Sequence, residues 1–353
     1  MSADTPPRRH ARRRPSAALT LKHLAADLGI SATAVSRALR GLSGVSDELR
    51  AKVRRRAAEV NYVPNLAGAA LSTGSFKTFA FVLPSTPFPT LLEMEVLEGF
   101  IRAVADQGYR VNIISESFLA QSGASLADEL ANTLCDGALV FYLRLDEAPI
   151  DTRRLAFPMV LVNRAVEGMA ADVVMTDDQG GAHLAVSHLV ELGHRRIAHI
   201  TGSQNNFNIM QRQLGYRQAL LTHGIDYDPA IVTGSDHTRE GGRKSALALF
   251  ETGQQFSAIF CCDDAVALGA MDVVRARGLS VPRDISLVGF GDDVYSGMVD
   301  PPLTTVSKPR HLMGREAGRL LLDRVAGRAT GTHVTVSLST KLLVRGTAAA
   351  PAA

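Results

Sequence analysis

The chain has 353 residues, of which 46% are hydrophobic and 21% are charged, and its formal net charge is +3. This composition is ordinary for a globular chain of about two or three domains. No apolar run approaches the roughly 18 residues of a membrane span, and the arginine-rich start lacks the apolar core of a secretory signal. We therefore expect a cytoplasmic protein with no membrane partner.

Basic charge is concentrated near the N-terminus. Residues 1–76 contain 13 Lys and Arg against 5 Asp and Glu, a net charge of +8, whereas residues 77–353 carry a net charge of −5. A protein that neutralises DNA phosphates needs such a local excess of basic residues. Residues 1–18 form a basic, disordered tail, which is either merely solvated or an additional phosphate contact.

Residues 19–65 predict a head of three short helices. In the first helix Leu21, Leu24 and Leu28 form one stripe at 3.6 residues per turn, and the pair Gly29-Ile30 ends it. A helix of this length is stable only when its apolar stripe packs against a neighbour. The head therefore depends on contacts between its helices.

The second helix of the head, expected over 32–39, predicts the main contact with nucleic acid. Ser31 is placed to cap it, and Val35 and Leu39 face inward, four residues apart. A small-residue face with one arginine can lie in a major groove about 12 Å wide, with the arginine reaching guanine O6 and N7. This outer face consists of Ala32, Thr33, Ser36 and Arg37. The motif is a helix-turn-helix, and double-stranded DNA is the predicted partner.

A third helix is expected to start after Ser46, which is placed to cap it. Its basic run, Arg54-Arg55-Arg56, is either a solvated helix face or a contact with backbone phosphates. Residues 66–76 follow as a candidate hinge helix and linker, because an alanine-rich segment precedes the flexible stretch Ser72-Thr73-Gly74-Ser75.

From Thr78 onward, short apolar runs alternate with amphipathic helices, which is typical of parallel sheets in an α/β fold. The number of units predicts two subdomains within 77–345, with a ligand in a cleft at the strand ends, and 346–353 as a tail. The expected strands are 79–83, 111–114, 138–141, 159–162, 197–200, 231–233, 258–261 and 285–288. The expected helices are 91–107, 124–134, 181–192, 210–223, 241–252, 265–277 and 313–325.

Three further patterns are compatible with catalytic or metal chemistry. Paired acids suggest either a metal-dependent phosphotransfer site or polar groups at strand ends, and we favour the second because no phosphate loop accompanies them. The histidines are spread over helix, turn and strand, so they do not predict one zinc site, and the cysteines predict reduced thiols. We expect no catalytic residues, no metal and no cofactor. The residues concerned are Asp177-Asp178, Asp263-Asp264, Asp292-Asp293, His183, His188, His194, His199, Cys135, Cys261 and Cys262.

The order of these motifs resembles the LacI/GalR family of bacterial transcriptional regulators, from Leu19 to about Arg345. The resemblance implies an all-α helix-turn-helix head and an α/β body like that of periplasmic binding proteins, with two parallel-sheet subdomains. The motifs in the head are Gly29-Ile30-Ser31, Val35-Ser36-Arg37-Ala38-Leu39, Gly44-Val45-Ser46 and Tyr62-Val63-Pro64-Asn65. Those in the body include Leu192-Gly193-His194-Arg195-Arg196-Ile197, Arg212, Gly215-Tyr216, Val288-Gly289-Phe290 and Pro301-Pro302-Leu303-Thr304-Thr305-Val306.

The resemblance also implies a homodimer, or a dimer of dimers, that binds a pseudo-palindromic operator in the nucleoid. In the family a hinge helix enters the minor groove and wedges a leucine between base pairs, and Leu71 matches that leucine. Gly68 departs from the family pattern and costs a helix roughly 1 kcal/mol, so we expect this hinge to order less readily. The expected DNA-binding residues are Thr20, Ser31, Ala32, Thr33, Ser36, Arg37, Asn65 and Leu71.

In the family an effector in the cleft controls operator affinity. Arg212 matches an arginine that holds effector oxygens, whereas Asp263 and Gly291 depart from the family's Asn and Asp. We expect a small, polar, carbohydrate-like effector, a sugar or sugar acid, bound by Phe88, Arg164, Arg212, His237, Asp263 and Asp292. The predicted function is a sequence-specific transcriptional regulator, a repressor. The alternative is a cytoplasmic solute-binding protein with vestigial DNA binding.

Overall fold

The computed structural model describes residues 20–41, 43–62, 74–84, 91–141, 144–146 and 148–352. The chain divides into two compact units, Met1–Phe76 and Lys77–Ala353, and each is described by itself. In these described ranges no helix is long and apolar enough to cross a lipid bilayer. The predicted DNA-binding residues Asn65 of the head and Leu71 of the hinge, and the predicted effector residue Phe88, lie outside the described ranges.

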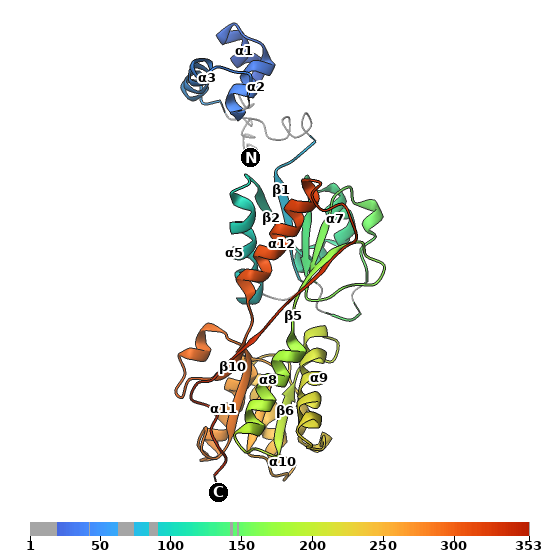
Figure 1. Cartoon of the computed structure of the whole chain (residues 1–353), viewed down its shortest axis with the longest axis vertical. Helices are drawn as coiled ribbons and strands as arrows, with labels where there is room; N and C mark the ends of the chain where they lie inside the picture. Colours follow the sequence, from blue (N-terminus) through green and yellow to red (C-terminus); the bar gives the residue numbers. More distant parts are fainter. Residues whose placement is uncertain are drawn as a thin grey trace, which may run out of the picture. The chain divides into compact units, whose positions relative to one another are not determined.

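The first unit contains α1 (Leu21–Leu28), α2 (Ala32–Arg40) and α3 (Asp47–Glu59), as the sequence predicted (Figure 1). Both predicted caps are present, because Ser31 Oγ accepts from the backbone N of Ala34 at 3.1 Å and Ser46 Oγ accepts from that of Leu49 at 3.2 Å. Gly29 and Gly41 end α1 and α2 in the left-handed conformation that favours glycine. The helices share a small core of buried side chains: Leu24, Ala25, Val35, Ala38, Val53 and Ala57.

The second unit contains two six-stranded sheets. The first has the order β11-β5-β4-β3-β1-β2 and is parallel throughout; the second has the order β12-β10-β9-β8-β6-β7, in which β12 runs antiparallel to β10. The first sheet consists of β1 (Thr78–Leu83), β2 (Arg110–Ser115), β3 (Ala138–Phe141), β4 (Met159–Val162), β5 (Asp172–Thr176) and β11 (Thr335–Leu338). The second consists of β6 (Ile197–Thr201), β7 (Val232–Gly234), β8 (Ala258–Cys261), β9 (Ser286–Gly291), β10 (Thr304–Ser307) and β12 (Lys341–Leu343).

Helices cover these sheets and define two subdomains. Helix α12 packs along α5 beside the first sheet, whereas α8, α9, α10 and α11 accompany the second (Figure 1). A Cβ on Gly314 would lie 2.0 Å from the carbonyl O of Val96, so the close approach of α12 to α5 requires glycine there. The helices are α5 (Leu91–Ala105), α6 (Glu116–Ser122), α7 (Leu126–Asn132), α8 (Asp178–Glu191), α9 (Phe207–Thr222), α10 (Arg239–Glu251), α11 (Asp264–Ala276) and α12 (Arg310–Val325).

The chain passes between the two subdomains three times: from β5 to α8, from β10 to α12, and from β11 to β12. Two of these crossings are joined by hydrogen bonds. The backbone N of Asp177 donates to the carbonyl O of Leu338 at 2.9 Å, and Thr340 Oγ1 donates to the carbonyl O of Asp177 at 3.3 Å. The second crossing carries Lys308, a buried cation.

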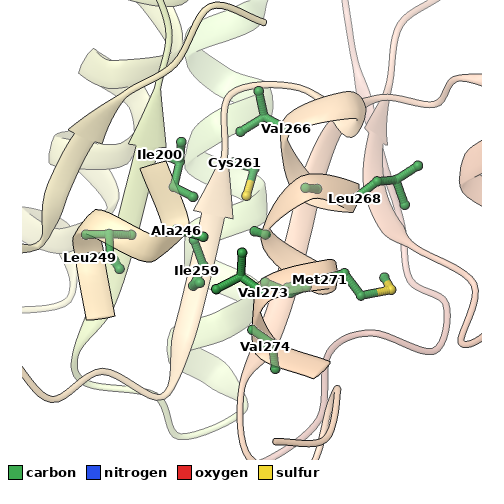
Figure 2. Packing of buried hydrophobic residues seen from close by; sticks show 14 of the residues in the cluster. Ile200, Ala246, Leu249, Ile259, Cys261, Val266, Leu268, Met271, Val273 and Val274 are labelled. Carbon is green, nitrogen blue, oxygen red and sulfur yellow. The ribbon is translucent and has the colours of Figure 1, made fainter. Parts of the chain in front are cut away.

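Apolar side chains pack on both faces of each sheet, which explains why the central strands are continuous apolar runs in the sequence. Figure 2 shows one such cluster, in which Ile259 and Cys261 of β8 lie among side chains of α10 and α11. Val266, Met271 and Val273 of α11 belong to the same cluster. This packing fixes the positions of the strand ends, where the cavity described below lies.

The structure contains strands that the sequence analysis did not predict. Strand β10 is buried, but its residues Thr304-Thr305-Val306-Ser307 do not form an apolar run; β5, β11 and β12 were likewise missed. The predicted tail at 346–353 is corrected for its described part. The side chain of Thr347 is fully buried, Leu287 N donates to the carbonyl O of Thr347 at 2.7 Å, and Ala349 N donates to Ser286 Oγ at 3.1 Å. These hydrogen bonds connect residues 347–349 to β9, so this segment is part of the folded body.

Candidate functional site

The predicted DNA-binding residues of α2 lie on the accessible side of the head. Thr33 and Arg37 are exposed, and Ala32 and Ser36 are half-buried. The Arg37 side chain rests on the following turn, where its Nε donates to the carbonyl O of Ser43 at 3.2 Å. A contact with a base would require this side chain to leave that turn. Thr20 and Ser31 are exposed and cap α1 and α2.

The three arginines of α3 do not form one uniform basic face. Arg54 and Arg55 are exposed, whereas Arg56 Nη2 lies 2.8 Å from Asp27 Oδ2 and its Nη1 lies 3.2 Å from Glu59 Oε2. Arg56 thus ties α3 to α1. Of this run, Arg54 and Arg55 are the residues suited to a phosphate contact.

A cavity of about 530 Å³ lies within the second unit, at the carboxyl ends of the second sheet's strands. Its volume is in the range of small-molecule sites. Side chains from α5, from α9, from the β10–α12 crossing and from the loops after β7, β8 and β9 surround it. The lining residues are Leu92, Glu93, Asn206, Asn208, Ile209, Arg212, Asp236, His237, Asp263, Ala265, Phe290, Gly291, Asp293, Tyr295, Lys308 and Arg310.

Arg212 is held rigidly at the floor of this cavity. Its Nε donates to Asp178 Oδ1 at 2.7 Å, its Nη1 donates to the carbonyl O of Cys262 at 2.5 Å, and its guanidinium lies 4.0 Å from the ring centre of Phe290. Lys308 Nζ lies 3.8 Å from the same Asp178 carboxylate. The fork of Arg212 is therefore oriented before any ligand arrives.

Burial and neighbouring charges shift the pKa values of Lys308 and Asp178 in opposite directions. Burial lowers the pKa of Lys308 to about 8, although Asp178 opposes that shift. Burial alone would raise the pKa of Asp178, but the charges of Lys308 and Arg212 hold that pKa below its ordinary value. At neutral pH one carboxylate therefore faces two cations.

A third buried cation, Arg310, contacts the loop after β9. Its Nη2 donates to Asp293 Oδ1 at 2.7 Å and its Nη1 donates to Glu95 Oε2 at 3.3 Å. Tyr295 Oη donates to the other oxygen of Asp293 at 2.5 Å. A Cβ on Gly291 would lie 3.1 Å from Arg310 Nη2, so glycine leaves room for this guanidinium.

His237 and Asp263 form a third polar pair in the cavity wall. His237 Nδ1 lies 2.8 Å from Asp263 Oδ2, while Asp263 Oδ1 accepts from the backbone N of Val266 and caps α11. His237 has φ +68°, a conformation that costs a non-glycine residue free energy. A Cβ on Gly202 would lie 2.3 Å from His237 Cε1, so this ring position also requires the glycine.

Two polar atoms of cavity-lining residues are buried without a hydrogen-bond partner among the described residues: Arg310 Nε and Asn208 Oδ1. The amide nitrogen of Asn208 is engaged, since it lies 3.3 Å from both Asn163 Oδ1 and Asp178 Oδ2. An unpaired buried donor or acceptor costs about 1–3 kcal/mol. A ligand or water that offers both an acceptor and a donor would recover this free energy.

Three of the six predicted effector residues, Arg212, His237 and Asp263, line the cavity together. Two others, Asp292 and Arg164, are not among the described lining residues. Asp292 turns away at φ +58° and its Oδ1 accepts from Arg345 Nη2 at 2.6 Å, and its neighbours Gly291 and Asp293 line the cavity instead. Arg164 Nη2 donates to the carbonyl O of Arg144 at 2.7 Å, outside the described lining.

Sequence reasoning missed several residues of the cavity wall, namely Asn208, Phe290, Asp293, Tyr295, Lys308 and Arg310, and also Asp178 behind it. Lys308 and Arg310 flank a proline directly after β10. Because this strand was not predicted, nothing in the sequence indicated that the two residues follow a strand end at the cavity. Asp178 was considered only as half of an acidic pair. Its position in the first turn of a buried helix was the signal that could have placed it.

Asp264, behind the cavity wall, gives a prediction for the pH dependence of stability. It is fully buried and accepts from Asp293 N at 2.8 Å, Ser296 Oγ at 2.6 Å and Thr305 Oγ1 at 2.5 Å. Burial raises its pKa from 3.8 to about 6 despite these donors. A raised folded-state pKa gives stability that is complete below about pH 3.8 and is lost as pH rises through about 6, roughly 3 kcal/mol in total.

We therefore expect the free energy of unfolding of an Asp264→Asn protein, relative to wild type, to increase by roughly 3 kcal/mol between pH 3 and pH 7. Urea unfolding of both proteins at each pH unit measures this difference. Parallel stability profiles for the two proteins would contradict the prediction.

A helix-turn-helix head and an α/β body with a polar cavity at its strand ends define a DNA-binding protein with a small-molecule site. Residues 20–65 match the family described as bacterial regulatory proteins, lacI family, and residues 186–348 match the periplasmic binding protein-like domain. The repressor CytR of Escherichia coli K12 is 34% identical over 330 residues, 93% of this chain and 96% of its own length. The regulator CelR of Thermobifida fusca is 34% identical over 346 residues, 95% and 98% of the two chains.

Structural comparison gives the same result. A complex of the transcriptional regulator CelR with cellobiose superposes with a TM-score of 0.71 at 32% identity, over 93% of this chain and 99% of that chain. A lac repressor dimer bound to operator and the anti-inducer ONPF has a TM-score of 0.79 at 24% identity, over 94% and 99% of the chains, which shows the shared fold. The chain belongs to the lacI family of bacterial regulatory proteins, and it is a DNA-binding transcriptional regulator.

Proposed function

We propose that this protein is a repressor that binds a pseudo-palindromic operator as a homodimer and changes its affinity when a small polar effector occupies the cavity. The observation that carries the effector site is the buried, pre-oriented Arg212 at the floor of a cavity of about 530 Å³. Coupling between the two sites requires that the effector bind two states of the body unequally. Twofold symmetry of the protein would be matched by symmetry of the operator. The protein would act in the cytoplasm, on the nucleoid.

We propose further that the effector is a neutral, hydroxyl-rich compound such as a sugar, and not a sugar acid. Each cation of the described lining already faces a carboxylate: Arg212 and Lys308 face Asp178, and Arg310 faces Asp293. The lining also contains the acids Glu93, Asp236 and Asp263. Counted with Asp178, the cavity wall holds three cations against five acids, so an added carboxylate would enter a cavity of net negative charge. A hydroxyl group can both donate and accept hydrogen bonds, so it suits a wall that contains carboxylates as well as cations, whereas a carboxylate can only accept.

A direct test compares neutral sugars with the corresponding sugar acids. Isothermal titration calorimetry of the full chain measures binding, and competition with labelled operator measures the response. We expect a neutral sugar to bind and to shift operator affinity, with its acid counterpart at least about tenfold weaker. Tighter binding of the acid would overturn the neutral-effector proposal.

Operator recognition is tested by incubating the purified protein with sheared DNA of its source organism at physiological salt and sequencing the bound fragments. We expect a pseudo-palindrome, because a twofold-symmetric dimer reads two inverted half-sites. Capture of fragments with no common sequence, with and without neutral sugars, would overturn the repressor proposal and favour a solute-binding protein with vestigial DNA binding.

Substitution of Arg37 on the exposed face of α2 should weaken sequence reading. We expect Arg37→Ala to reduce affinity for the captured operator by about 1–3 kcal/mol and to relax the preference at one base pair of each half-site. Fluorescence anisotropy with single-base variants of the operator measures both effects. Arg54→Ala is the matched control, because loss of an exposed phosphate contact should weaken all sequences equally.

A further inference from the structure

Three side chains with metal-ligand chemistry converge on one wall of the cavity. His237 Nδ1, Cys262 Sγ and one carboxylate oxygen of Asp263 all lie within 4.8 Å of one another. The closest approaches are 2.8 Å between His237 Nδ1 and Asp263 Oδ2, and 3.6 Å between Cys262 Sγ and the same oxygen. One nitrogen, one sulfur and one oxygen donor form a set that suits zinc.

The topology of the second sheet explains this convergence. Strands β8, β6 and β7 are neighbours in the sheet and run parallel, so their carboxyl ends meet at one edge. Cys262 and Asp263 follow β8, Gly202 follows β6, and His237 lies in the loop after β7. The missing side chain of Gly202 makes room for the imidazole ring. The sequence analysis did not join His237 to the cysteine pair, because 25 residues separate them along the chain.

Two of the three donor–donor distances fit a tetrahedral ion after a small adjustment. With metal–ligand bonds of about 2.0–2.3 Å, the edges of a tetrahedron are roughly 3.3–3.8 Å long. The sulfur-to-oxygen distance of 3.6 Å already matches such an edge. The nitrogen-to-oxygen distance of 2.8 Å must widen by roughly half an ångström when an ion replaces the shared proton. The His237 side chain is about one-third exposed, at 35%, so its ring has room for that movement.

We propose that His237, Cys262 and Asp263 bind one divalent transition-metal ion of the zinc class in the cavity wall, with a fourth coordination position facing the cavity. Binding releases the thiol proton to solvent and moves the imidazole proton from Nδ1 to Nε2, so the ligand set becomes a thiolate, a carboxylate and a neutral imidazole, whose charge of −2 balances the ion. His237 and Asp263 line the cavity whereas Cys262 is fully buried behind them, which directs the open position inward. Occupation of that position by an effector oxygen rests on the proposed function, whereas the metal site itself does not.

The experiment uses the full chain, stripped of metal by dialysis against a chelator and titrated with Co²⁺ alone. We expect one ion per chain and an absorption band from thiolate-to-cobalt charge transfer, a signature that a site without cysteine cannot produce. Competition with Zn²⁺ against a chromophoric chelator then measures affinity. We expect Cys262→Ala to remove the band and to weaken binding by at least about 10- to 100-fold.

Cys261→Ala is the matched control, because it removes the neighbouring buried thiol, which is not one of the three donors. It should retain the band and the stoichiometry. His237→Asn is the second variant: asparagine tolerates the positive φ, so the loop is preserved while the ring nitrogen is lost, and it too should abolish tight binding. This variant keeps the test valid even if Cys262→Ala does not fold.

Failure of wild type to bind Co²⁺ or Zn²⁺ at one equivalent, or equal binding by wild type and His237→Asn, would overturn the metal site. Operator capture and sugar binding in the presence of chelator report separately on the proposed function. A metal-binding protein that lacks a sugar response would contradict the proposed function and leave the metal site intact.

Discussion

An Arg212→Met protein is expected to lose its response to the effector and to become less stable by about 3–5 kcal/mol. The substitution removes the group that fixes Asp178 at 2.7 Å, and it leaves that carboxylate fully buried with Lys308 at 3.8 Å as its remaining cation. Removing one partner of a buried ion pair costs this much because the other charge stays out of water. Urea unfolding and effector-dependent release of operator measure the two effects.

The matched control for this prediction is Arg217→Met on the same helix, α9. Arg217 is exposed and its guanidinium stacks 4.3 Å from the ring centre of Tyr227, so its loss should cost at most about 1 kcal/mol. An Arg212→Met protein that still responds normally to its effector would show that this arginine supports the fold and not the ligand.

A Leu24→Ala protein is expected to lose operator binding entirely while its body remains folded. The core of the head contains few buried side chains, and Leu24 is one of those that are fully buried. A Leu→Ala change in a core costs about 2–5 kcal/mol, which is comparable to the whole stability of a domain of roughly 60 residues. Differential scanning calorimetry should show the transition of the head lost and that of the second unit unchanged.

Lys22→Ala, at an exposed position in the first turn of α1, is the control for stability of the head. Its effect on unfolding should stay within about 0.5 kcal/mol. If Leu24→Ala also lowers the unfolding temperature of the second unit, the two units do not unfold independently and the prediction is wrong.

The head was almost entirely predictable from the sequence, because its helices are set by local signals. Caps at Ser31 and Ser46, the helix-ending Gly29 and the inward Val35 all act within a few residues of the chain. The central strands of the body were predictable for a similar reason, since a fully buried strand must be apolar throughout.

The crossings and the cavity wall depend on contacts between distant residues, and the sequence analysis was weaker there. Strand β10 is buried through threonines, whose hydroxyl groups find partners such as Asp264 across 41 residues of sequence. Asp292 was predicted as a ligand residue in place of Asp293 because a one-residue difference in a turn reverses the direction of a side chain. Arg212, His237 and Asp263 were predicted correctly as cavity residues, because each stands in a motif that resembles the family pattern.

The three crossings between the subdomains have a mechanical consequence. Covalent connections at three points resist sliding and stretching of one subdomain against the other, and they leave rotation about the line of crossings as the softest motion. Asp178 and Lys308 lie at two of these crossings, and Arg212 forms an ion pair with Asp178. A molecule bound in the cavity lies close to these crossings. A displacement of a fraction of an ångström there would correspond to a larger displacement at the far ends of the subdomains. We therefore expect a small displacement at the crossings to accompany a larger rotation of one subdomain against the other.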